Sequence, residues 1–511
     1  MPSTVPLAAA EAPLVLALDL GTSSLRALLF DRWGRAVQGS EEQHAHRIRT
    51  TVDGGAETDP VPLFDLLVRC IDGALARAGD RVGEIAAVGT SCFWHSLVGV
   101  DANGDPVTPL LLWADTRSAP HAAALRATFA GDVIHERTGC PFHSSFWPAK
   151  LRWLSHTSPD AVARVARWQG FSEYIGARLA GESGDAISVS MASATGLLDV
   201  HRQAWDRTVL KAVGVAPEGV PPLTDRTEPW TSLRPAFSDR WPVLAGVPWY
   251  PAVGDGACAN IGSGAVGPER IALTLGTSGA MRIVRAAQDV PVPPDIWAYR
   301  VDRDRFVLGG ALSNGGNLLA WLGKLLGVGY GDETTKLAAA LPPDAHGLTV
   351  LPFLAGERSP AWHDRSAGVV AGLTLATGPE ALLRAGMEAV AYRFAAIYDR
   401  LCPLAEREHA IVANGGAILR SPLWLQIVAD TLGHDLLTLD PEAEASARGA
   451  ALLALEAVGA LPDLAAAPDP AEGGAVYRPD PDRHARYQKG RERQRKLEGL
   501  LYSPTGAWDV Q

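Results

Sequence analysis

The heptapeptide ALDLGTS at Ala17–Ser23 occurs again as ALTLGTS at Ala272–Ser278, in the second half of a chain of 511 residues. Six of the seven positions are identical, and the seventh is Asp19 in the first copy and Thr274 in the second. The repeat predicts two related halves that face each other. Because only one copy carries a carboxylate, the halves are expected to do different jobs at one shared site.

The first copy reads as a strand, a tight turn and a returning strand. Leu14–Leu20 (LVLALDL) is an apolar run typical of a buried strand, and Leu25–Phe30 (LRALLF) returns after the turn. Such a turn directs backbone N–H groups and small hydroxyls to one point, which suits a phosphate. Asp19 ends the first strand, where it can hold Mg²⁺ directly or through water. An ordinary hairpin with a chance aspartate is the alternative, and the second copy makes it less favoured.

Length and composition indicate a globular protein of two or more domains. The chain has a mass of 54.0 kDa, 47% apolar and 20% charged residues, and is too long for one core. Its net charge of −11 argues against a nucleic acid or an anionic membrane as a general partner. A local basic pocket for a phosphate stays compatible with that charge.

The lack of a recognisable targeting signal and the pattern of cysteines both favour the cytoplasm. The N-terminal MPSTVPLAAAEAP has no basic region before its short apolar stretch, unlike a signal peptide. The sequence contains no run of about 18 uncharged apolar residues, so no membrane span is expected. The cysteines are odd in number and lack the spacing of a metal site, as expected for a reduced compartment: Cys70, Cys92, Cys140, Cys258 and Cys402.

Strand-like and helical stretches alternate, which predicts α/β architecture. Val82–Gly89 and Ser96–Val100 have strand character, and Pro62–Ala78 has helical spacing. The proline-rich segment 216–249 carries three tryptophans and is expected to be ordered connecting structure, before a hinge-like GSGAVG at 262–267. We expect a tail over 1–13, an N-terminal domain over 14–261, a C-terminal domain over 262–460, and a loop with a charged helix over 461–511.

The sequence Gly254-Asp255-Gly256 follows the apolar stretch WYPAV. A carboxylate between two glycines at a strand end can approach a ligand closely. A hydroxyl that attacks phosphorus needs a base for its proton, and a carboxylate suffices because the transition state is loose. Asp255 is therefore a candidate base, with a simple turn aspartate as the alternative.

Aromatic and polar residues occur together in SCFWHS at 91–96 and in WADTR at 113–117. Sugars and polyols are usually bound by such mixtures, with rings against C–H faces and charged groups on hydroxyls. Trp94, His95 and Trp113, with Asp115 and Arg117 nearby, are candidate sugar-binding residues. A core tryptophan and an internally hydrogen-bonded histidine are the alternatives.

Glycine pairs mark places where the backbone can approach a nucleotide. Asn414-Gly415-Gly416-Ala417 lies between a strand-like run and a helical one, and Gly309-Gly310 and Gly315-Gly316-Asn317 are similar. None of these matches the P-loop or the G-x-G-x-x-G dinucleotide fingerprint, so both of those classes are set aside.

Taken in order, these motifs resemble the FGGY carbohydrate kinases. Two longer stretches strengthen the resemblance. Phe146–Leu154 (FWPAKLRWL) is similar to the first family signature, and Gly368–Glu388 resembles the second with a spacer about one residue short. The resemblance runs from Leu14 to Gly459, nearly the whole chain.

The resemblance implies two actin/hexokinase-like, ribonuclease-H-like domains with the active site in the cleft between them, and ATP-dependent phosphorylation of a sugar, polyol or sugar acid. It implies Asp255 as base, Trp94, His95 and Trp113 as substrate wall, and Asp19 with Asp255 as Mg²⁺ carboxylates. The implied phosphate and nucleotide residues are Gly21, Thr22, Ser23, Arg26, Gly276, Thr277, Gly316 and Gly416. It allows a homodimer, which the residues themselves do not establish.

The middle segment carries the substrate clue. Ser190–Asp206 (SMASATGLLDVHRQAWD) looks most like the gluconate kinases, and Asn414–Leu425 also resembles them. Gly256 stands where glycerol kinases have Gln, which disfavours glycerol. Trp94 stands where the family usually has Met, which can reshape the sugar pocket. Gluconate is the expected substrate, with xylulose, another ketose or a polyol next.

The sequence leaves two other functional classes of protein as alternatives. One is a nucleotide-binding regulator or ATPase on the same fold, which would need neither Asp255 nor the Trp and His residues. The other is an inactive sugar-binding protein, which retention of both Asp19 and Asp255 disfavours.

Overall fold

The computed structural model describes residues 2–328, 333–363, 366–440 and 442–502. They form two compact units, and the first is discontinuous: Met1–Val266, Val284–Val307 and Glu442–Pro470. The second consists of Gly267–Ile283, Leu308–Pro441 and Ala471–Gln511. The contiguous division expected from the sequence differs from these units, because two later segments pack with the N-terminal residues.

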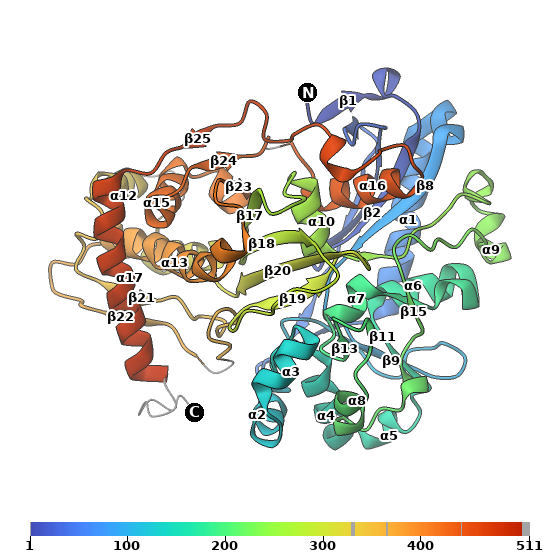
Figure 1. The fold of residues 1–511 in the computed structure, drawn as a ribbon, viewed down its shortest axis with the longest axis horizontal. Coiled ribbons are helices and arrows are strands. Elements are labelled where there is room, and N and C mark those ends of the chain that lie inside the picture. The colour runs from blue at the N-terminus through green and yellow to red at the C-terminus, as the bar shows by residue number, and fades with distance from the viewer. Residues whose placement is uncertain (1, 329–332, 364–365, 441, 503–511) are drawn as a thin grey trace. The chain divides into compact units, whose positions relative to one another are not determined.

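The first unit is built on a mixed sheet (Figure 1). Strand β5 pairs with β3, outside the main strand order β1-β4-β3-β2-β8-β16. The strands are β1 (Thr4–Pro6), β2 (Leu14–Leu20), β3 (Ser24–Phe30), β4 (Ala36–Gln38), β5 (Glu42–Ala45), β8 (Ile85–Cys92) and β16 (Val253–Gly254).

The repeated motif forms the hairpin that its sequence predicts. Strand β2 is buried at every position and pairs antiparallel with β3, with Asp19 opposite Arg26. On its other side β2 runs parallel to β8, which in turn runs parallel to β16. An apolar run without alternation suits a strand that is covered on both faces.

Helices cover both faces of this sheet. Leu18, Leu20 and Thr90 lie toward α1 (Pro60–Ala78) and α6 (Phe171–Ala180), with which they line one small cavity. A Cβ on Gly89, whose register partner is Ala17, would lie 2.4 Å from the carbonyl oxygen of Ala450 in α16 (Ala445–Ala457). Because side chains alternate along a strand, Asp19 shares the α16 face with Ala17.

Helix α10 (Asp255–Gly262) packs on α16 with almost no side chain between the two backbones. A Cβ on Gly262 would lie 1.8 Å from the carbonyl oxygen of Ala445, and one on Gly449 would lie 1.9 Å from that of Cys258. Only glycine allows so close an approach. The helix that begins at Asp255 is therefore held rigidly against the rest of the first unit.

The remainder of the first unit is a second, mainly helical layer. The core of this layer includes Trp147 and Leu151 from α4 (Trp147–Thr157), Trp168 from β11 (Arg167–Gln169) and Val209 from α8 (Arg207–Ala212). The proline-rich segment is ordered, as expected. Its tryptophans stack, with ring centroids 5.0 Å apart for Trp230 and Trp249 and 6.3 Å for Trp241 and Trp249.

The second unit repeats the strand arrangement of the first. Strand β17 pairs antiparallel with β18 and parallel with β23, and β23 runs parallel to β24. The strands in sheet order are β20 (Arg305–Leu312), β18 (Gly279–Ala286), β17 (Arg270–Leu275), β23 (Ala410–Asn414), β24 (Leu436–Thr438) and β25 (Val476–Tyr477). The division into units cuts through β18 and β20, because residues 284–286 and 305–307 are counted with the first unit. Both heptapeptide copies thus end equivalent strands, as expected for related halves. Strand β19 (Trp297–Arg300) lies wholly within the first unit.

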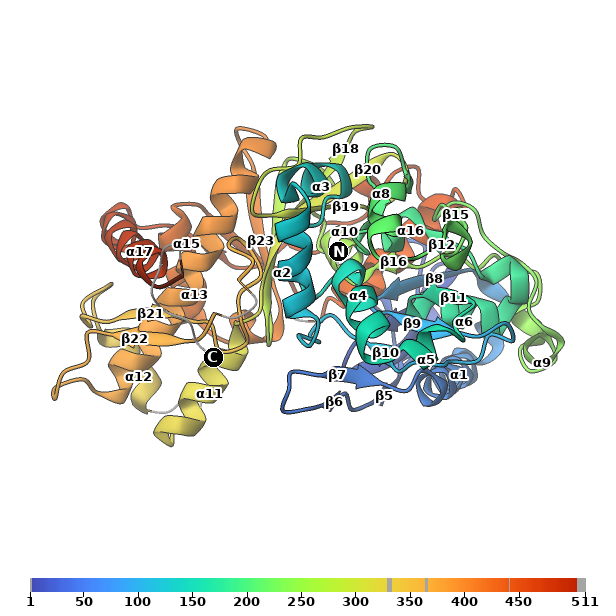
Figure 2. The same ribbon diagram turned by 90° about the horizontal axis from the view of Figure 1, so that it is seen from below.

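Three helices of the second unit lie side by side: α13 (Pro379–Leu401), α15 (Pro422–Leu432) and α17 (Pro481–Tyr502) (Figure 2). The predicted charged helix at the C-terminus is α17. It is anchored as well as solvated, because the buried Gln494 side chain donates to the carbonyl oxygens of Val350 at 2.8 Å and Ala389 at 3.1 Å. Among the described residues, none of the helices is long and apolar enough to cross a membrane.

Candidate active site

Three parallel strands of the first unit end next to one another, and two candidate carboxylates lie at these ends. Asp19 of β2 is the register partner of Ser91 in β8, and Ser91 is the partner of Val253 in β16. Asp255 follows β16 directly as the first residue of α10. Since neighbouring strands lie about 4.8 Å apart, the backbones of Asp19 and Val253 are separated by about 10 Å. The structure therefore brings Asp19 and Asp255 to the same edge of one sheet.

Asp255 is positioned by the helix that it begins. Gly254 is the N-cap, and Oδ1 of Asp255 accepts a hydrogen bond from the backbone N–H of Gly256 at 2.8 Å. Unpaired N–H groups make a helix N-terminus partly positive, which favours a negatively charged carboxylate there. The side chain is only partly buried. It can thus act as a charged acceptor while remaining accessible to a ligand.

Gly254 is required because Trp94 occupies the space beside it. A Cβ added to Gly254 would lie 1.7 Å from Cε2 and 1.8 Å from Nε1 of the Trp94 indole, far inside van der Waals contact. Trp94 is 5% exposed. The large side chain that replaces the usual methionine therefore lies directly against the residue before Asp255.

An aromatic cluster surrounds Trp94 and His95. The Trp94 ring packs edge-on against Tyr299 and Trp297, with centroids 5.0 and 5.8 Å away, and those two rings stack at 4.2 Å. His95 contacts Phe146 at 5.1 Å and Tyr299 at 5.7 Å. Sequence reasoning missed Trp297 and Tyr299. They alternate on β19, more than 200 residues after Trp94, and no local pattern links the two segments.

His95 is held in an unusual backbone conformation. Its φ of 68° lies in the left-handed region, which side chains other than glycine rarely adopt. Its Nδ1 lies 2.7 Å from the carbonyl oxygen of Ala194 and must donate to it, because a carbonyl only accepts. That contact orients the ring and sets its tautomer, so that Nε2 carries no proton in the neutral form.

Helix α4, formed by the first family-like signature, supports this loop from behind. The buried Lys150 ammonium donates to the carbonyl oxygens of His95 at 2.8 Å and Leu112 at 2.9 Å. Trp147 Nε1 donates to the carbonyl oxygen of Ser96 at 2.9 Å. Burial lowers the pKa of Lys150 to about 7, against the opposing charge of Asp115. Lys150 therefore ties the Trp94–His95 loop to the segment that continues into Trp113.

The segment that indicated gluconate kinases lies behind the candidate site. Ser190 Oγ accepts from the N–H of Gly254 at 3.2 Å, and Ser193 Oγ accepts from the N–H of Arg300 at 2.9 Å. The carbonyl oxygen of Thr195 accepts from the N–H of Trp147 at 3.0 Å. The buried Ser190–Thr195 run therefore connects the strand before Asp255, the aromatic strand β19 and helix α4.

The WADTR segment divides into two parts. Asp115 is buried and accepts from Arg117 at 2.6 Å and from the backbone N–H of Ala56 at 3.1 Å. Arg117 also contacts Glu57, and its guanidinium stacks on Trp153 at 4.5 Å. These two charged residues are thus engaged within the protein. Trp113 is half-buried and follows the anchored Leu112, and its contact with a sugar stays a prediction.

Asp19 is paired with Arg26 across the hairpin. Arg26 donates to Oδ2 of Asp19 from Nε at 2.9 Å and from Nη2 at 2.8 Å, and its Nη1 lies 2.5 Å from Glu444. Burial opposes the charge of Arg26, but both carboxylates outweigh it, so the pKa of Arg26 is raised above its usual value. Both Arg26 contacts are to Oδ2, so Asp19 could still offer its other oxygen, Oδ1, to Mg²⁺, an ion that prefers carboxylate ligands.

The first turn keeps its backbone compact and its hydroxyls accessible. Gly21 N–H donates to the carbonyl oxygen of Ser24 at 3.0 Å, and the Gly21 carbonyl accepts from His46 Nε2 at 3.0 Å. Thr22 is half-buried and Ser23 is exposed. These residues lie beside Asp19 at the same sheet edge, and their contact with a phosphate stays a prediction.

The second turn and the glycine-rich segments converge within the second unit. The Gly276 carbonyl accepts from the N–H of Gly316 at 2.8 Å, and the Thr277 carbonyl accepts from that of Asn317 at 3.1 Å. A Cβ on Gly316 would lie 2.9 Å from that of Ala417, the residue after Gly416. Gly276, Thr277, Gly316 and Gly416, far apart in sequence, are therefore neighbours.

A cluster in the second unit resembles a metal site by composition alone. Glu388 lies 2.9 Å from His346, and the two residues have Asp344 beside them. Arg384 also donates to Glu388 at 2.6 Å, and Arg493 contacts Asp344. Two arginines already balance the two carboxylates, so the cluster is an ion-pair network that attaches α17.

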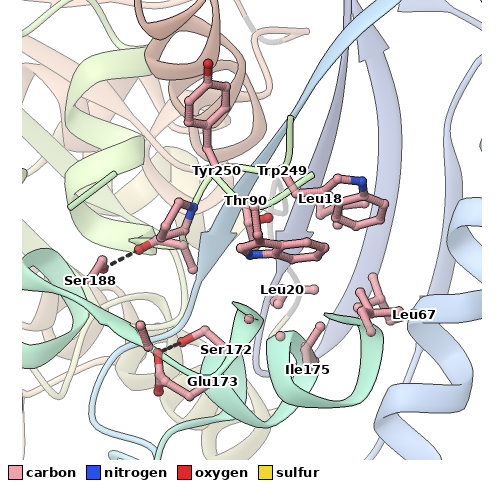
Figure 3. A pocket seen from close by; sticks show the side chains of 17 residues that line it. Leu18, Leu20, Leu67, Thr90, Ser172, Glu173, Ile175, Ser188, Trp249 and Tyr250 are labelled. Carbon is pink, nitrogen blue, oxygen red and sulfur yellow. Dashed lines mark hydrogen bonds between the residues drawn. The ribbon is translucent and has the colours of Figure 1, made fainter. Parts of the chain in front are cut away.

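The small cavity on the α1 and α6 side of the first sheet is not the sugar site. Its volume is about 40 Å³, which suits water rather than a sugar. It lies between Leu18 and Leu20 of β2, Leu67 of α1 and the buried Glu173 of α6 (Figure 3). Burial raises the pKa of Glu173 to about 7. All the candidate residues described above lie outside this lining.

Comparison with known proteins identifies the family of this chain. Models of the N-terminal and C-terminal domains of the FGGY family of carbohydrate kinases match residues 14–262 and 271–458. The gluconokinase of Bacillus subtilis (strain 168) is 29% identical over 479 residues, 91% of each chain. The xylulose kinase of Streptomyces rubiginosus is 32% identical over 475 residues, also 91% of each.

Solved structures give the same result. The crystal structure of gluconate kinase from Lactobacillus acidophilus aligns with a TM-score of 0.85 at 26% identity, covering 96% of this chain and 98% of that one. The predicted two-domain α/β fold and the predicted similarity to gluconate kinases are both confirmed. The chain belongs to the FGGY family of carbohydrate kinases and is a phosphotransferase that acts on a sugar hydroxyl.

Proposed function

We propose that this kinase transfers the γ-phosphoryl group of ATP to a hydroxyl of gluconate, with Asp255 as the general base. The observation that carries the proposal is the position of Asp255: it begins α10, shares a sheet edge with Asp19 and follows the glycine that contacts Trp94. A partly exposed carboxylate at a helix N-terminus, beside an aromatic wall, suits a base that serves a polyhydroxylated substrate.

In the proposed reaction the substrate hydroxyl passes its proton to the Asp255 carboxylate as its oxygen attacks the γ-phosphorus, and ADP leaves. Little covalent chemistry is asked of the protein, so the rate depends on positioning and on compensation of charge. Asp19 and Asp255 would hold Mg²⁺, which when bound neutralises charge on the phosphates. Arg26, Thr22 and Ser23 would contact phosphate oxygens on their side.

Within the second unit, Gly276, Thr277, Gly316 and Gly416 would bind the nucleotide. Their backbone groups converge, and glycine at 316 and 416 leaves room for a ligand to approach the chain. Trp94, His95 and Trp113 would bind the sugar, with Phe146, Trp297 and Tyr299 supporting the first two. We also place the reaction in the cytoplasm, since all five cysteines are free thiols.

Gluconate is proposed because the matched gluconokinase and gluconate kinase cover nearly the whole chain. Xylulose is the second candidate, because the Streptomyces rubiginosus xylulose kinase is slightly more identical, at 32%. The Ser190–Thr195 run does not decide between them, since the hydroxyls of Ser190 and Ser193 are engaged with backbone N–H groups of the protein. Trp94 fills space beside Asp255 and is expected to restrict which sugar fits.

A coupled ADP-release assay with Mg·ATP and a panel of gluconate, xylulose, ribulose, glycerol and erythritol tests the proposal. The expected result is rapid release with gluconate and little with the others. Strong ADP release with xylulose alone would show that xylulose, and not gluconate, is the substrate. Release that is independent of every sugar would reject the proposed role of the Trp94 and His95 wall.

A further inference from the structure

A second, larger cavity lies in the first unit, on the side of α4 that carries Arg152. Its volume is about 370 Å³, within the range of small-molecule sites. Helices α4, α5 (Pro159–Val162) and α8 contribute to it and lie together in Figure 1. The lining residues that the argument uses are Leu151, Arg152, His156, Trp168, Lys211 and Val213.

The polar part of this cavity is cationic. Arg152, His156 and Lys211 line it, and none of the eleven described lining residues is acidic. Neither Arg152 nor Lys211 forms an ion pair with any residue that the structure describes, and Nε of Arg152 is buried without a hydrogen-bond partner there. A buried donor without a partner costs free energy, which a bound acceptor would recover.

The cationic side chains of the cavity lie close to a further histidine, His121. Burial lowers the pKa of His121, and the positive charges of His156 and Arg152 lower it further. The His121 and His156 rings are 5.0 Å apart. His156 donates from Nδ1 to the carbonyl oxygen of Arg152 at 2.7 Å, which leaves Nε2 available.

The remaining walls are apolar and well ordered by packing. Leu151, Trp168 and Val213 are buried members of the core of this layer. The carbonyls at the end of α8 would repel an anion if they were unpaired. The Lys211 carbonyl accepts from the N–H of Gly214, and the Leu210 carbonyl accepts from that of Val215, so both are engaged.

We propose that this cavity binds a small phosphate ester, with the phosphate at Arg152 and Lys211 and the carbon skeleton against the wall at Trp168. Two permanent cations match a dianion better than they match a single carboxylate, and charge-assisted bonds to phosphate oxygens are strong. The site is separate from the proposed active site, because none of the candidate catalytic, sugar or nucleotide residues lines it. The proposal therefore goes beyond the kinase reaction.

Isothermal titration calorimetry with phenyl phosphate and with inorganic phosphate, at near-physiological salt, tests the site. Phenyl phosphate is expected to bind more tightly, because its ring can cover the apolar wall. Lys211→Gln and Arg152→Gln should each weaken it by about tenfold, the loss of one charge-assisted contact. Lys211 is exposed, so its replacement leaves the fold intact. Arg207→Gln removes the same charge from the same helix outside the cavity and should change nothing.

The active site also has phosphate turns, so the titration is repeated with saturating ADP. Binding that persists with ADP and is lost in Lys211→Gln supports the proposal. Binding that ADP abolishes, equal binding to wild type and Lys211→Gln, or no binding of phenyl phosphate to wild type would each overturn it. Histidine NMR provides a second readout, since a bound phosphate should raise the pKa of His121 in wild type and not in Lys211→Gln.

Discussion

Arg26 donates two hydrogen bonds to one carboxylate oxygen of Asp19, from Nε at 2.9 Å and from Nη2 at 2.8 Å. The residues are cross-strand partners in the hairpin of the first heptapeptide. In the second copy Thr274 replaces the aspartate and faces Ala280. The repeat therefore preserves the strand and turn, whereas the charge pair exists on one side only, as expected if only that side holds a metal ion.

Asp19→Ala tests the proposed metal role. Loss of the carboxylate should raise the Mg²⁺ concentration needed for half-maximal turnover by about tenfold or more. The KM for the sugar should stay within about twofold, because Asp19 lies on the phosphate side. Mg²⁺ titration of the initial rate is the measurement. Glu41→Gln removes a nearby carboxylate, 3.8 Å from Arg26, and serves as the control. An unchanged Mg²⁺ dependence in Asp19→Ala would remove the metal role.

Asp255→Asn tests the proposed base. The amide keeps the size of the side chain but cannot take up the substrate proton, so kcat should fall by about 10²–10⁴-fold. The dissociation constant of ATP should be nearly unchanged, which equilibrium binding of a fluorescent nucleotide can measure. A variant with near-normal kcat would show that another group accepts the proton.

Gly254→Ala tests the contact between Trp94 and the residue before Asp255. The added methyl group would overlap the indole and must displace Trp94 or α10, at a cost of about 1–3 kcal/mol. Activity should fall sharply. Trp94→Met vacates the space, so the double variant should recover part of what Gly254→Ala loses. Gly83→Ala, where a Cβ meets no atom within 4 Å, is the control.

Steady-state kinetics of the four proteins gives a coupling energy between the two positions. We expect about 1 kcal/mol or more, as for residues in direct contact. Strictly additive effects of Gly254→Ala and Trp94→Met would contradict the packing described for this pair.

Local pattern was enough to predict the parts of the site that lie near one another in sequence. The hairpin followed from Leu14–Leu20 and its returning strand, and the glycines around Asp255 located a carboxylate at a strand end. The convergence of Gly276 with Gly316 needed the resemblance to a family, because no local signal joins segments 40 residues apart.

The parts that sequence reasoning missed depend on long-range packing. Trp297 and Tyr299 reach Trp94 from β19, and a three-residue WAY pattern has no feature that marks it as part of a site. The Ser190–Thr195 run carried the similarity to gluconate kinases, but its local pattern did not indicate its partners. The hydroxyls of Ser190 and Ser193 accept hydrogen bonds from the N–H groups of Gly254 and Arg300, and only the folded chain creates these contacts. Lys150 was visible only as part of a signature, and its two carbonyl partners lie 55 and 38 residues away.

Lys150→Met tests whether this buried lysine positions the sugar-binding segments. The change leaves the carbonyls of His95 and Leu112 without their donor, which costs about 1–3 kcal/mol. The KM for the sugar should rise by about tenfold, while the KM for ATP stays within about twofold. Arg226→Met is the matched control, since Arg226 is also buried in the first unit and pairs with Asp302 and Glu456. It should lower stability without raising the sugar KM. A rise in both KM values, or in neither, would contradict the positioning role.

The pH dependence of stability gives an independent check on Lys150. Burial lowers its pKa to about 7, whereas the unfolded chain keeps a lysine pKa near 10.5. Between these values unfolding takes up a proton, so this group makes the protein more stable as pH rises and less stable as pH falls toward 7. Lys150→Met lacks the effect, and the other groups titrate alike in both proteins. The Tm of wild type minus that of the variant should therefore increase from pH 7 to pH 9. A Tm difference that is constant or decreases over this range would show that the ammonium keeps its proton in the folded protein.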